Sequence, residues 1–309
     1  MKVVFMGTPE FAVPTLKKIY ENKYDIPLVI TQPDRPKGRG KKLASPPVKV
    51  EAERLGIKVF QPEKVNKKEA IELLESISPD VIVVVAYGQI LKEEILQLPK
   101  YGCINVHASL LPYYRGAAPI NWAIINGEKK TGITTMYMDR GLDTGDMILK
   151  REVLIGENET AGQLHDRLKE IGAELLVETL RYIEKGQIKR IPQDNSIATY
   201  APILNKSIGK INWEKTADRI HNLVRGLNPW PCAYFEYNDM KVKVFMTEVC
   251  KEIKEGNIGQ VVKVDNEGIY VSTAKDCLVI KELQFPNKKR MRVSEYLKGN
   301  EFPTGIILK

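Results

Sequence analysis

An amide and an imidazole side chain stand two residues apart in the run Cys103-Ile-Asn-Val-His-Ala-Ser-Leu-Leu-Pro112. The apolar residues around them predict a β-strand, in which residues i and i+2 project from the same face. Asn105 can then donate a hydrogen bond to an oxyanion that forms on a carbonyl group, while His107 stabilises that charge or moves a proton. The alternative is that His107 is a core histidine with a structural role.

A carboxylate that fixes the tautomer of His107 would complete this site. Asp143 is the best-placed candidate, because it lies in the glycine-flanked loop Gly141-Leu-Asp-Thr-Gly-Asp146 that follows a later predicted strand. Asp139 and Asp146 flank the loop and are expected to form turns with their own side chains. The same structural role remains open for Asp143.

The elements that position these residues alternate between strand and helix over the first hundred residues. The run from 80 to 86 is a continuous series of mostly β-branched residues, which indicates a strand covered on both faces, as in a parallel sheet. We therefore predict a doubly wound α/β domain with a mostly parallel, Rossmann-like sheet, whose ligand sites lie at the carboxyl ends of its strands. The predicted strands are 2–6, 25–31, 58–60, 80–86 and 103–107, and the predicted helices begin near Pro14 and span 48–55, 67–77 and 91–98.

The first domain is expected to continue to residue 188, and a second domain is expected to follow it. Strands are expected at 132–139 and 147–153 and a long helix at 160–184, with Thr160 and Gln163 in the spacing of a capping box. Residues 189–205 are polar and irregular, and a helix lies within 212–227. Five short strand-like runs follow and favour a small C-terminal β-barrel of the oligonucleotide-binding type. The predicted domains are 1–188 and 206–309, joined by a linker at 189–205. Trp230, between two prolines, is expected to be a core or hinge residue.

Positive charge is concentrated in two parts of the chain. The chain has a net charge of +8; residues 206–309 hold 18 Lys/Arg against 13 Asp/Glu, a net +5, and the predicted long loop 34–49 holds six basic residues and one acid, also +5. This distribution suits a polyanion that touches the loop and the C-terminal domain. The alternative is a basic surface that serves solubility alone.

Several classes of protein are disfavoured. No apolar run approaches the roughly 18 residues of a membrane span, and the N-terminus lacks a secretory signal, so we expect a soluble cytoplasmic protein. The four cysteines are far apart and form no metal or disulfide pattern, so no metal site is expected. His165 and His221 lie within predicted helices and are expected to be structural.

Motifs spread over the whole chain carry a resemblance to a known family. They are Phe5-Met-Gly-Thr-Pro-Glu-Phe11, Thr31-Gln-Pro-Asp-Arg-Pro-Lys-Gly-Arg-Gly-Lys-Lys-Leu43, Val84-Val-Ala-Tyr-Gly88, Asn105-Val-His-Ala-Ser-Leu-Leu-Pro112 with Tyr114-Arg-Gly-Ala-Ala-Pro-Ile120, Gly141-Leu-Asp-Thr-Gly-Asp146 and Asn228-Pro-Trp-Pro231. Together they resemble the formyltransferases that use 10-formyltetrahydrofolate. Several independent motifs in the same order make the resemblance specific.

The resemblance implies a role for each matched residue. Asn105, His107 and Asp143 fall on the family's catalytic trio. The family's folate-binding segment corresponds to Ser109, Leu110, Leu111 and Pro112. The loop that the family inserts against the acceptor stem of a tRNA corresponds to the loop that contains Arg39, Lys41 and Lys42, and the C-terminal domain resembles the family's tRNA-binding barrel.

The implied reaction is transfer of the formyl group of 10-formyltetrahydrofolate to the free α-amino group of methionine on initiator tRNA, with no metal. The implied partners are this charged tRNA and the folate donor, and a monomer is expected. One rival is a formyltransferase of the same fold that acts on a small amine, such as a ribonucleotide or a nucleotide sugar; it would not need a basic loop or barrel. A second rival is a non-catalytic RNA-binding protein on this scaffold, against which the intact trio argues.

Overall fold

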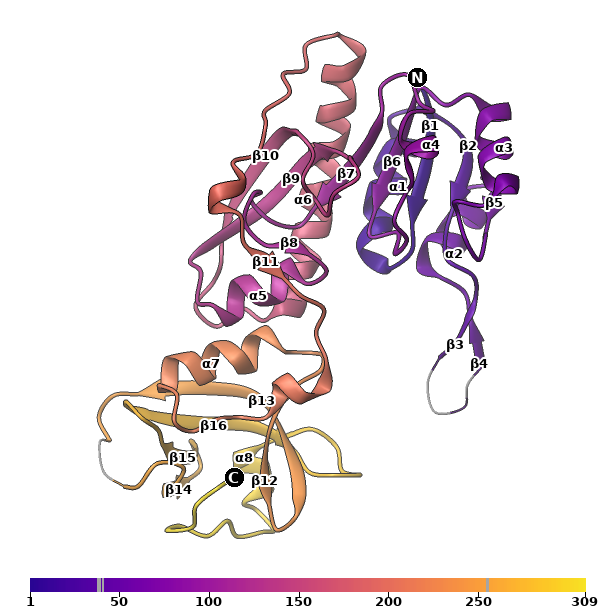
Figure 1. Ribbon diagram of the computed structural model, residues 1–309. Coiled ribbons are helices and arrows are strands. Elements are labelled where there is room, and N and C mark those ends of the chain that lie inside the picture. Colours follow the sequence, from indigo (N-terminus) through magenta and orange to yellow (C-terminus); the bar gives the residue numbers. More distant parts are fainter. Residues whose placement is uncertain (38–39, 41, 254–255) are drawn as a thin grey trace. The chain divides into compact units, whose positions relative to one another are not determined.

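The structure of the chain is a computed structural model that describes residues 1–37, 40, 42–253 and 256–309 (Figure 1). The chain divides into two compact units. Unit 1 comprises Met1–Gly116, Thr131–Val153 and His165–Tyr200, and unit 2 comprises Ala117–Lys130, Leu154–Leu164 and Ala201–Lys309. The doubly wound α/β fold predicted for the first domain is confirmed in unit 1, as its sheet shows.

Unit 1 is built on a seven-stranded sheet with the order β10-β9-β7-β6-β1-β2-β5. The five strands from β7 to β5 are parallel, and β9 runs antiparallel to β7. All five residues of β6 are buried, as its β-branched sequence predicts. The strands are β1 (Lys2–Gly7), β2 (Asp25–Ile30), β5 (Val59–Phe60), β6 (Val81–Val85), β7 (Cys103–His107), β9 (Lys130–Tyr137) and β10 (Met147–Leu154).

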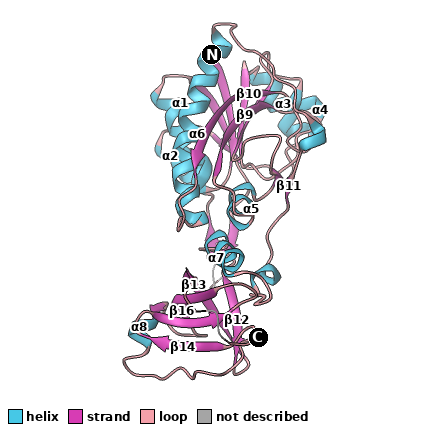
Figure 2. Ribbon diagram, turned by 90° about the vertical axis from the view of Figure 1, so that its left-hand side faces the viewer, coloured by secondary structure: helices cyan, strands magenta, loops and turns pink. Residues whose placement is uncertain are grey.

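Helices cover both faces of this sheet. Figure 2 shows α1 (Val13–Glu21), α2 (Pro47–Arg54) and α6 (Ala161–Glu184) on one side of it, with α3 (Lys68–Ile77) and α4 (Glu93–Leu96) on the other. The α3 and α4 side shares a buried apolar cluster with alternate residues of β1, β2 and β6 and with Cys103 of β7. Because side chains alternate along a strand, Asn105 and His107 project to this same side.

The long helix α6 begins where the sequence predicts. The backbone N–H of Thr160 donates to Oε1 of Gln163 at 2.9 Å, and the backbone N–H of Gln163 donates to Oγ1 of Thr160 at 3.3 Å. These reciprocal bonds are a capping box, in which two backbone donors of the first turn find acceptors. The predicted cap is confirmed.

Unit 2 contains an antiparallel sheet with the order β12-β13-β16-β15-β14, and β17 pairs with β16. Its last residues join the two ends of this order: Leu308 donates to Gly259 beside β14, and Lys309 exchanges backbone hydrogen bonds with Glu236 of β12. The sheet is thereby closed by the chain end, as a small barrel requires. The elements are α5 (Pro119–Ile125), α7 (Ala217–Gly226), β12 (Ala233–Tyr237), β13 (Met240–Cys250), β14 (Val261–Asp265), β15 (Gly268–Ser272), β16 (Cys277–Gln284), β17 (Met291–Arg292) and α8 (Val293–Tyr296).

A buried core fills unit 2. Side chains from the inward faces of its strands pack with Trp213, Ile220 and Val224, and α7 lies against β13 and α5. Along β13 the residues from Lys241 to Val244 alternate between exposed and buried, which is the pattern of a strand with one face on a core. The antiparallel C-terminal domain predicted from the sequence is confirmed.

Two sequence-based expectations are wrong. The loop 34–49 is not wholly irregular, because β3 (Arg35–Lys37) and β4 (Lys42–Ala44) form an antiparallel pair within it. The core alternative for Trp230 is wrong, since 53% of the residue is exposed, and the hinge alternative stays a prediction. In each case a short Pro-rich motif suggested irregular or buried structure, and pairing between segments decided otherwise.

Two features are absent from the part of the chain that the structure describes. No helix there is both long and apolar enough to cross a membrane. No three His, Cys, Asp or Glu side chains there are grouped so that they could hold a metal ion.

Candidate active site

Strand β7 carries the first two site residues to the carboxyl end of the sheet. Asn105 lies opposite Val84 of β6 and Met136 of β9, and His107 lies opposite Thr134 of β9. Asn105 is half-buried and His107 is 6% exposed. The interior position of β7 therefore fixes both side chains on a rigid element.

Asp143 is delivered by the loop between β9 and β10. Oδ1 of Asp139 accepts hydrogen bonds from the backbone N–H of Gly141 at 3.0 Å and from Oγ1 of Thr144 at 2.6 Å, which confirms the turn-forming role predicted for Asp139. Asp143 itself has a left-handed backbone with φ of 55°, a conformation that Asp tolerates better than most residues.

The loop requires a glycine at position 145. A Cβ on this residue would lie 1.9 Å from the carbonyl oxygen of Tyr137, a separation that no side chain can adopt. The loop therefore passes directly over the end of β9, and this close approach returns Asp143 toward β7.

The three predicted residues come together around the carboxylate of Asp143. Nδ2 of Asn105 donates to Oδ1 at 3.4 Å, and Nδ1 of His107 lies 3.6 Å from Oδ2. The backbone N–H of Gly116 donates to Oδ2 at 2.8 Å. Both carboxylate oxygens thus face polar groups, and the carboxylate is held beside the histidine ring.

The ring of His107 has an acceptor at each nitrogen. Nε2 lies 2.9 Å from the carbonyl oxygen of Tyr114, and a carbonyl oxygen can only accept, so Nε2 carries a proton. A proton on Nδ1 would face the carboxylate of Asp143. The arrangement can therefore hold the doubly protonated ring, which suits a residue that stabilises an anion or moves a proton.

The predicted folate-binding segment forms a packed turn after β7. Oγ of Ser109 donates to the carbonyl oxygen of Tyr113 at 2.6 Å, and Oγ1 of Thr134 donates to the carbonyl oxygen of Ser109 at 2.7 Å. Ser109, Leu111 and Pro112 are buried, whereas Leu110 is half-exposed. The segment is thus a fixed wall beside His107.

Lys150 supports the same wall from β10. Its Nζ donates to the carbonyl oxygen of Leu111, and burial lowers the pKa of its ammonium group from the ordinary value. The hydrogen bond places a cation directly behind the turn.

The predicted tRNA-binding residues are only partly described. Arg39 and Lys41 lie outside the described residues. The backbone of Lys42 begins β4, where it lies opposite Lys37 of β3.

A second candidate feature is the edge of the sheet between β1 and β6. The strand order places β2 and β5 on one side of β1 and β6 and β7 on the other, so the direction of winding changes between β1 and β6. Ligands of doubly wound folds bind in the crevice at such a point. Oγ1 of Thr8, after β1, donates to the carbonyl oxygen of Tyr87, after β6, at 2.8 Å.

The side chain of Tyr87 packs in the buried apolar cluster beneath α3 and α4. Its hydroxyl is buried and has no hydrogen-bond partner among the residues that the structure describes, and burial raises its pKa above the ordinary value. A buried hydroxyl without a partner is costly.

Sequence reasoning missed the residues that surround the trio. Gly116 and Tyr114 contribute through their backbone, which carries no sequence signal. Gln193 lies in the predicted linker, yet its Nε2 donates to the carbonyl oxygen of Asp143 at 2.8 Å. Only a pairing between distant segments, which no local pattern reveals, brings this residue to the site.

Comparisons with known proteins agree with this geometry. Residues 1–180 match a family model described as formyl transferase, and residues 203–301 match one described as the C-terminal domain of formyl transferase. The chain is 60% identical to a methionyl-tRNA formyltransferase of Clostridioides difficile over 308 residues, which is 100% of both chains. It is 53% identical to a methionyl-tRNA formyltransferase of Acetivibrio thermocellus over 100% of this chain and 99% of that one.

Solved structures share the fold at lower identity. One is WlaRD, a sugar 3N-formyl transferase crystallised in the presence of dTDP and 5-N-formyl-THF; it is 24% identical with a TM-score of 0.70, over 94% of this chain and 99% of that one. Another is an N-formyltransferase of Helicobacter canadensis, 22% identical with a TM-score of 0.68, over 94% of this chain and 100% of that one.

Proposed function

The chain belongs to the formyl transferase family, and from this premise we propose that it transfers the formyl group of 10-formyltetrahydrofolate to the α-amino group of methionyl-initiator tRNA. The observation that carries the proposal is the match of both parts of the chain, over their whole length, to enzymes named for methionyl-tRNA. The product is N-formylmethionyl-tRNA, which serves translation initiation.

The reaction exchanges one carbon–nitrogen bond for another. The donor supplies a formyl group on its N10 atom. The neutral α-amine attacks the formyl carbon, the bond from that carbon to N10 breaks, the amine loses one proton and N10 gains one. The formyl oxygen carries negative charge while both nitrogens are attached to the carbon.

Asn105 and His107 are the residues that stabilise this negative charge. An amide nitrogen has two N–H groups. One N–H group of Asn105 donates to Asp143, and this hydrogen bond is long, at 3.4 Å. The other is available to donate to the oxyanion. His107 stabilises the same charge as the protonated ring, with Asp143 and the carbonyl oxygen of Tyr114 holding its orientation.

The proton of the amine needs no strong base. Free α-amino groups have pKa values near about 7.7 to 8.0, and the neighbouring ester of the charged tRNA lowers this further. A large fraction of the amine is neutral near pH 7. Asp143 can accept the departing proton directly or through water, so positioning and charge stabilisation contribute most of the rate.

We place the folate donor at the carboxyl edge of the sheet. Two features support this placement: the point between β1 and β6 where the winding changes, and the wall made by Ser109, Leu110, Leu111 and Pro112. A donor bound there reaches the side of β7 on which Asn105 and His107 project.

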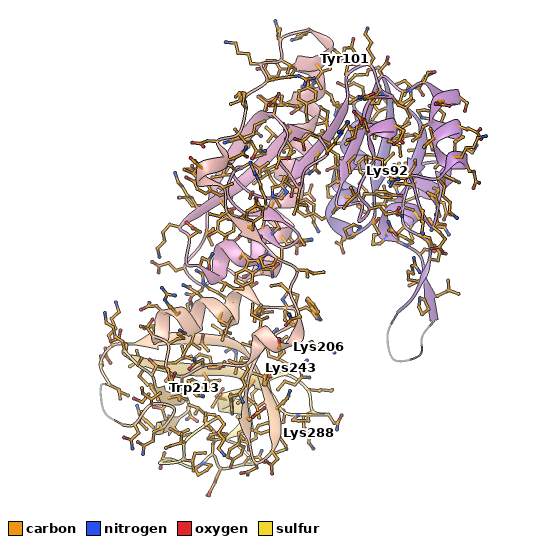
Figure 3. The ribbon with its side chains drawn as sticks, viewed as in Figure 1. Lys92, Tyr101, Lys206, Trp213, Lys243 and Lys288 are labelled. Atoms are coloured by element: carbon orange, nitrogen blue, oxygen red, sulfur yellow. The ribbon has the colours of Figure 1, made fainter. Side chains whose placement is uncertain are left out.

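We place the tRNA on the basic surfaces. Lys206, Lys243 and Lys288 are exposed and lie toward the same side of unit 2 (Figure 3). Within the described part of the chain, none of them forms an ion pair with a carboxylate. The charged loop that contains Arg39, Lys41 and Lys42 is the second proposed contact. Charged tRNA is made in the cytoplasm, which is where we place the enzyme, and it works as a monomer because one chain supplies the whole trio.

Transfer of a labelled formyl group to initiator and elongator methionyl-tRNA tests the proposal. We expect transfer to the initiator tRNA that weakens as salt rises, because phosphate contacts release counterions. Transfer to a sugar-nucleotide amine but not to tRNA would instead favour a small-amine formyltransferase. No transfer to any amine would favour a non-catalytic RNA-binding protein.

Arg39→Ala separates the loop from the chemistry. We expect this variant to bind methionyl-tRNA more weakly and to keep the wild-type KM for the folate donor, because a lost positive charge weakens attraction to the phosphates of the tRNA. An equal loss for both substrates would mean that the loop shapes the donor site.

A further inference from the structure

Residues 191–199 run alongside both segments that build the site. Ile191 exchanges backbone hydrogen bonds with Met147, at 2.9 and 3.0 Å, just beyond the Asp143 loop. Thr199 accepts from the backbone N–H of Arg115 at 2.9 Å, and its Oγ1 accepts from the backbone N–H of Tyr114 at 2.8 Å. This segment, which the sequence predicts to be linker, is therefore hydrogen-bonded to both sides of the trio.

Gln193 makes the central contact of the segment. Its Nε2 donates to the carbonyl oxygens of Asp143 and Gly145, both at 2.8 Å. Its Oε1 accepts from Nε of Arg115 at 3.1 Å and from a terminal nitrogen of the same guanidinium at 2.8 Å. One amide thus uses both donors and its acceptor at short distances.

Arg115 fixes the direction of that amide. The residue is 2% exposed, and its guanidinium donates to Gln193 and to Oδ1 of Asn195, the latter at 2.8 Å. A guanidinium can only donate, so it must face Oε1 of Gln193 and not its NH₂ group. The NH₂ group then has to point toward the Asp143 loop.

Only an amide side chain satisfies this position. A glutamate would still accept from Arg115, but its second oxygen would face the carbonyl oxygens of Asp143 and Gly145. A methionine would fill similar space without donating or accepting. The position is therefore specified by chemistry and not by volume alone.

The carboxylate of Asp143 is consequently held from two sides. Gln193 holds the loop backbone, and the backbone N–H of Gly116, next to Arg115, donates to Oδ2 at 2.8 Å. Oδ2 is also the oxygen that faces Nδ1 of His107. Without the hydrogen bonds from Gln193, Oδ2 would keep its contact with Gly116. The distance between Oδ2 and the ring of His107 would no longer be fixed.

We propose that Gln193 is a positioning residue for the reaction, which acts through Asp143 and is itself oriented by the buried Arg115. The inference rests on the proposed function, because it concerns the rate of formyl transfer. Gln193 does not touch the reacting atoms; it sets where the carboxylate stands relative to the ring of His107. A misplacement of about 1 Å at a reacting group can cost on the order of 10²-fold in rate.

The test compares Gln193→Glu and Gln193→Met with Asn195→Ala. Asn195 is a matched control, because it accepts from the same guanidinium but, among the described residues, forms no hydrogen bond with the Asp143 loop. We expect turnover of both Gln193 variants to fall on the order of 10²-fold, with KM for donor and tRNA and the melting temperature close to wild type. Asn195→Ala should keep most of its turnover.

A double-mutant cycle with Asp143→Asn tests whether Gln193 affects turnover through the carboxylate of Asp143. If Gln193 acts through the carboxylate, Gln193→Met costs little further turnover once Asp143 is replaced, because interacting residues are not additive. A residue that only stabilises the fold would cost the same factor in either background.

Each alternative outcome has a defined meaning. Full turnover in Gln193→Glu, equal losses in Asn195→Ala and Gln193→Met, additive losses with Asp143→Asn, or turnover that follows the melting temperature would each overturn the positioning role. If Gln193→Met does not fold, Gln193→Glu, which keeps the pairing with Arg115, decides alone. A wild-type chain that transfers no formyl group would overturn the proposed function instead.

Discussion

Asn105 has two N–H groups on its amide nitrogen, and one of them donates to the carboxylate of Asp143. The long 3.4 Å contact with Asp143 orients the amide without using it fully. This division makes the amide a pre-oriented donor, which is the kind of group that contributes most to catalysis because it needs no reorganisation during the reaction.

Replacing Asn105 by alanine removes one oxyanion donor. We expect turnover to fall roughly 10²- to 10³-fold, with little change in KM for either substrate, in a formyl-transfer assay. Asn158→Ala, which removes an exposed amide in unit 2, serves as the control. Near-full activity of Asn105→Ala would refute its assignment as a donor.

Cys103, two residues before Asn105, is buried, and its burial makes the stability of the fold depend on pH. Burial raises the pKa of its thiol from 9.0 to about 12. Between these values the unfolded chain releases the thiol proton while the folded chain keeps it. The folded state therefore loses stability as the pH rises from 9 toward 12, by up to about 1.4 kcal/mol per pH unit.

Cys103→Ala should remove this part of the alkaline loss. The measurement is the free energy of unfolding in urea at pH 8, 9, 10 and 11 for both proteins. We expect the variant to be less stable at pH 8, because a buried side chain is truncated, and the gap to narrow as the pH rises. A gap that stays constant would contradict the assignment.

At the scale of elements, the sequence predicts those that depend on local pattern. The bounds of β6 and β7 and the cap of α6 follow from β-branched runs and capping spacing, and the structure confirms them within one or two residues. The trio is likewise brought together as the spacing and the resemblance suggest. Its catalytic roles stay predictions.

What the sequence could not predict depends on pairing between distant segments. Residues 191–199 have no hydrophobic period, so nothing local marks Gln193 as part of the site. The exposure of Trp230 has the same origin, because it depends on how the turn lies on β13, where Nδ2 of Asn228 donates to the carbonyl oxygen of Phe245 at 2.9 Å. Long-range hydrogen bonds carry this information, and local propensity does not.

Helix α7 carries a half-buried histidine whose protonation opposes folding. Nδ1 of His221 lies 3.0 Å from Oγ1 of Thr247 and Nε2 lies 3.3 Å from the carbonyl oxygen of Glu157. Burial lowers the pKa of His221 below its ordinary value of 6.5, and Arg225 adds to this effect while Asp218 opposes it. The stability that neutral His221 contributes is complete above pH 6.5 and is lost as the pH falls below it.

His221→Gln should flatten this dependence. The measurement is the free energy of unfolding of the full chain at pH 5, 6, 7 and 8. We expect wild type to lose more stability than the variant between pH 7 and pH 5. A variant that loses as much as wild type would show that other groups cause the acid dependence.

At the scale of the whole molecule, charge and chemistry are carried by different parts of the chain. The trio lies in unit 1, where residues 34–49 carry a net charge of +5, and residues 206–309 in unit 2 hold a further +5. A phosphate-binding surface acts on affinity and its salt dependence, and the trio acts on turnover. The two contributions should therefore separate in kinetics.

Reversing three charges tests this separation. We expect the triple variant Lys206→Glu, Lys243→Glu and Lys288→Glu to raise KM for methionyl-tRNA and to flatten its salt dependence, because each lost phosphate contact reduces the slope by roughly one. KM for the folate donor should not change. Lys68→Glu, a charge reversal on the exposed face of α3, is the control. Equal effects of both variants would argue against a specific surface on unit 2.

The edges of the seven-stranded sheet also bear on self-association. Strand β5 at one edge has two residues, and β10 at the other carries exposed Lys150 and Glu152 and begins at Met147, which is paired with Ile191. Short, charged or covered edges give a second chain little to pair with. Ile191 thus covers the first residue of β10 at this edge, and we expect variants that lose this pairing to aggregate more readily on concentration even where the trio is intact.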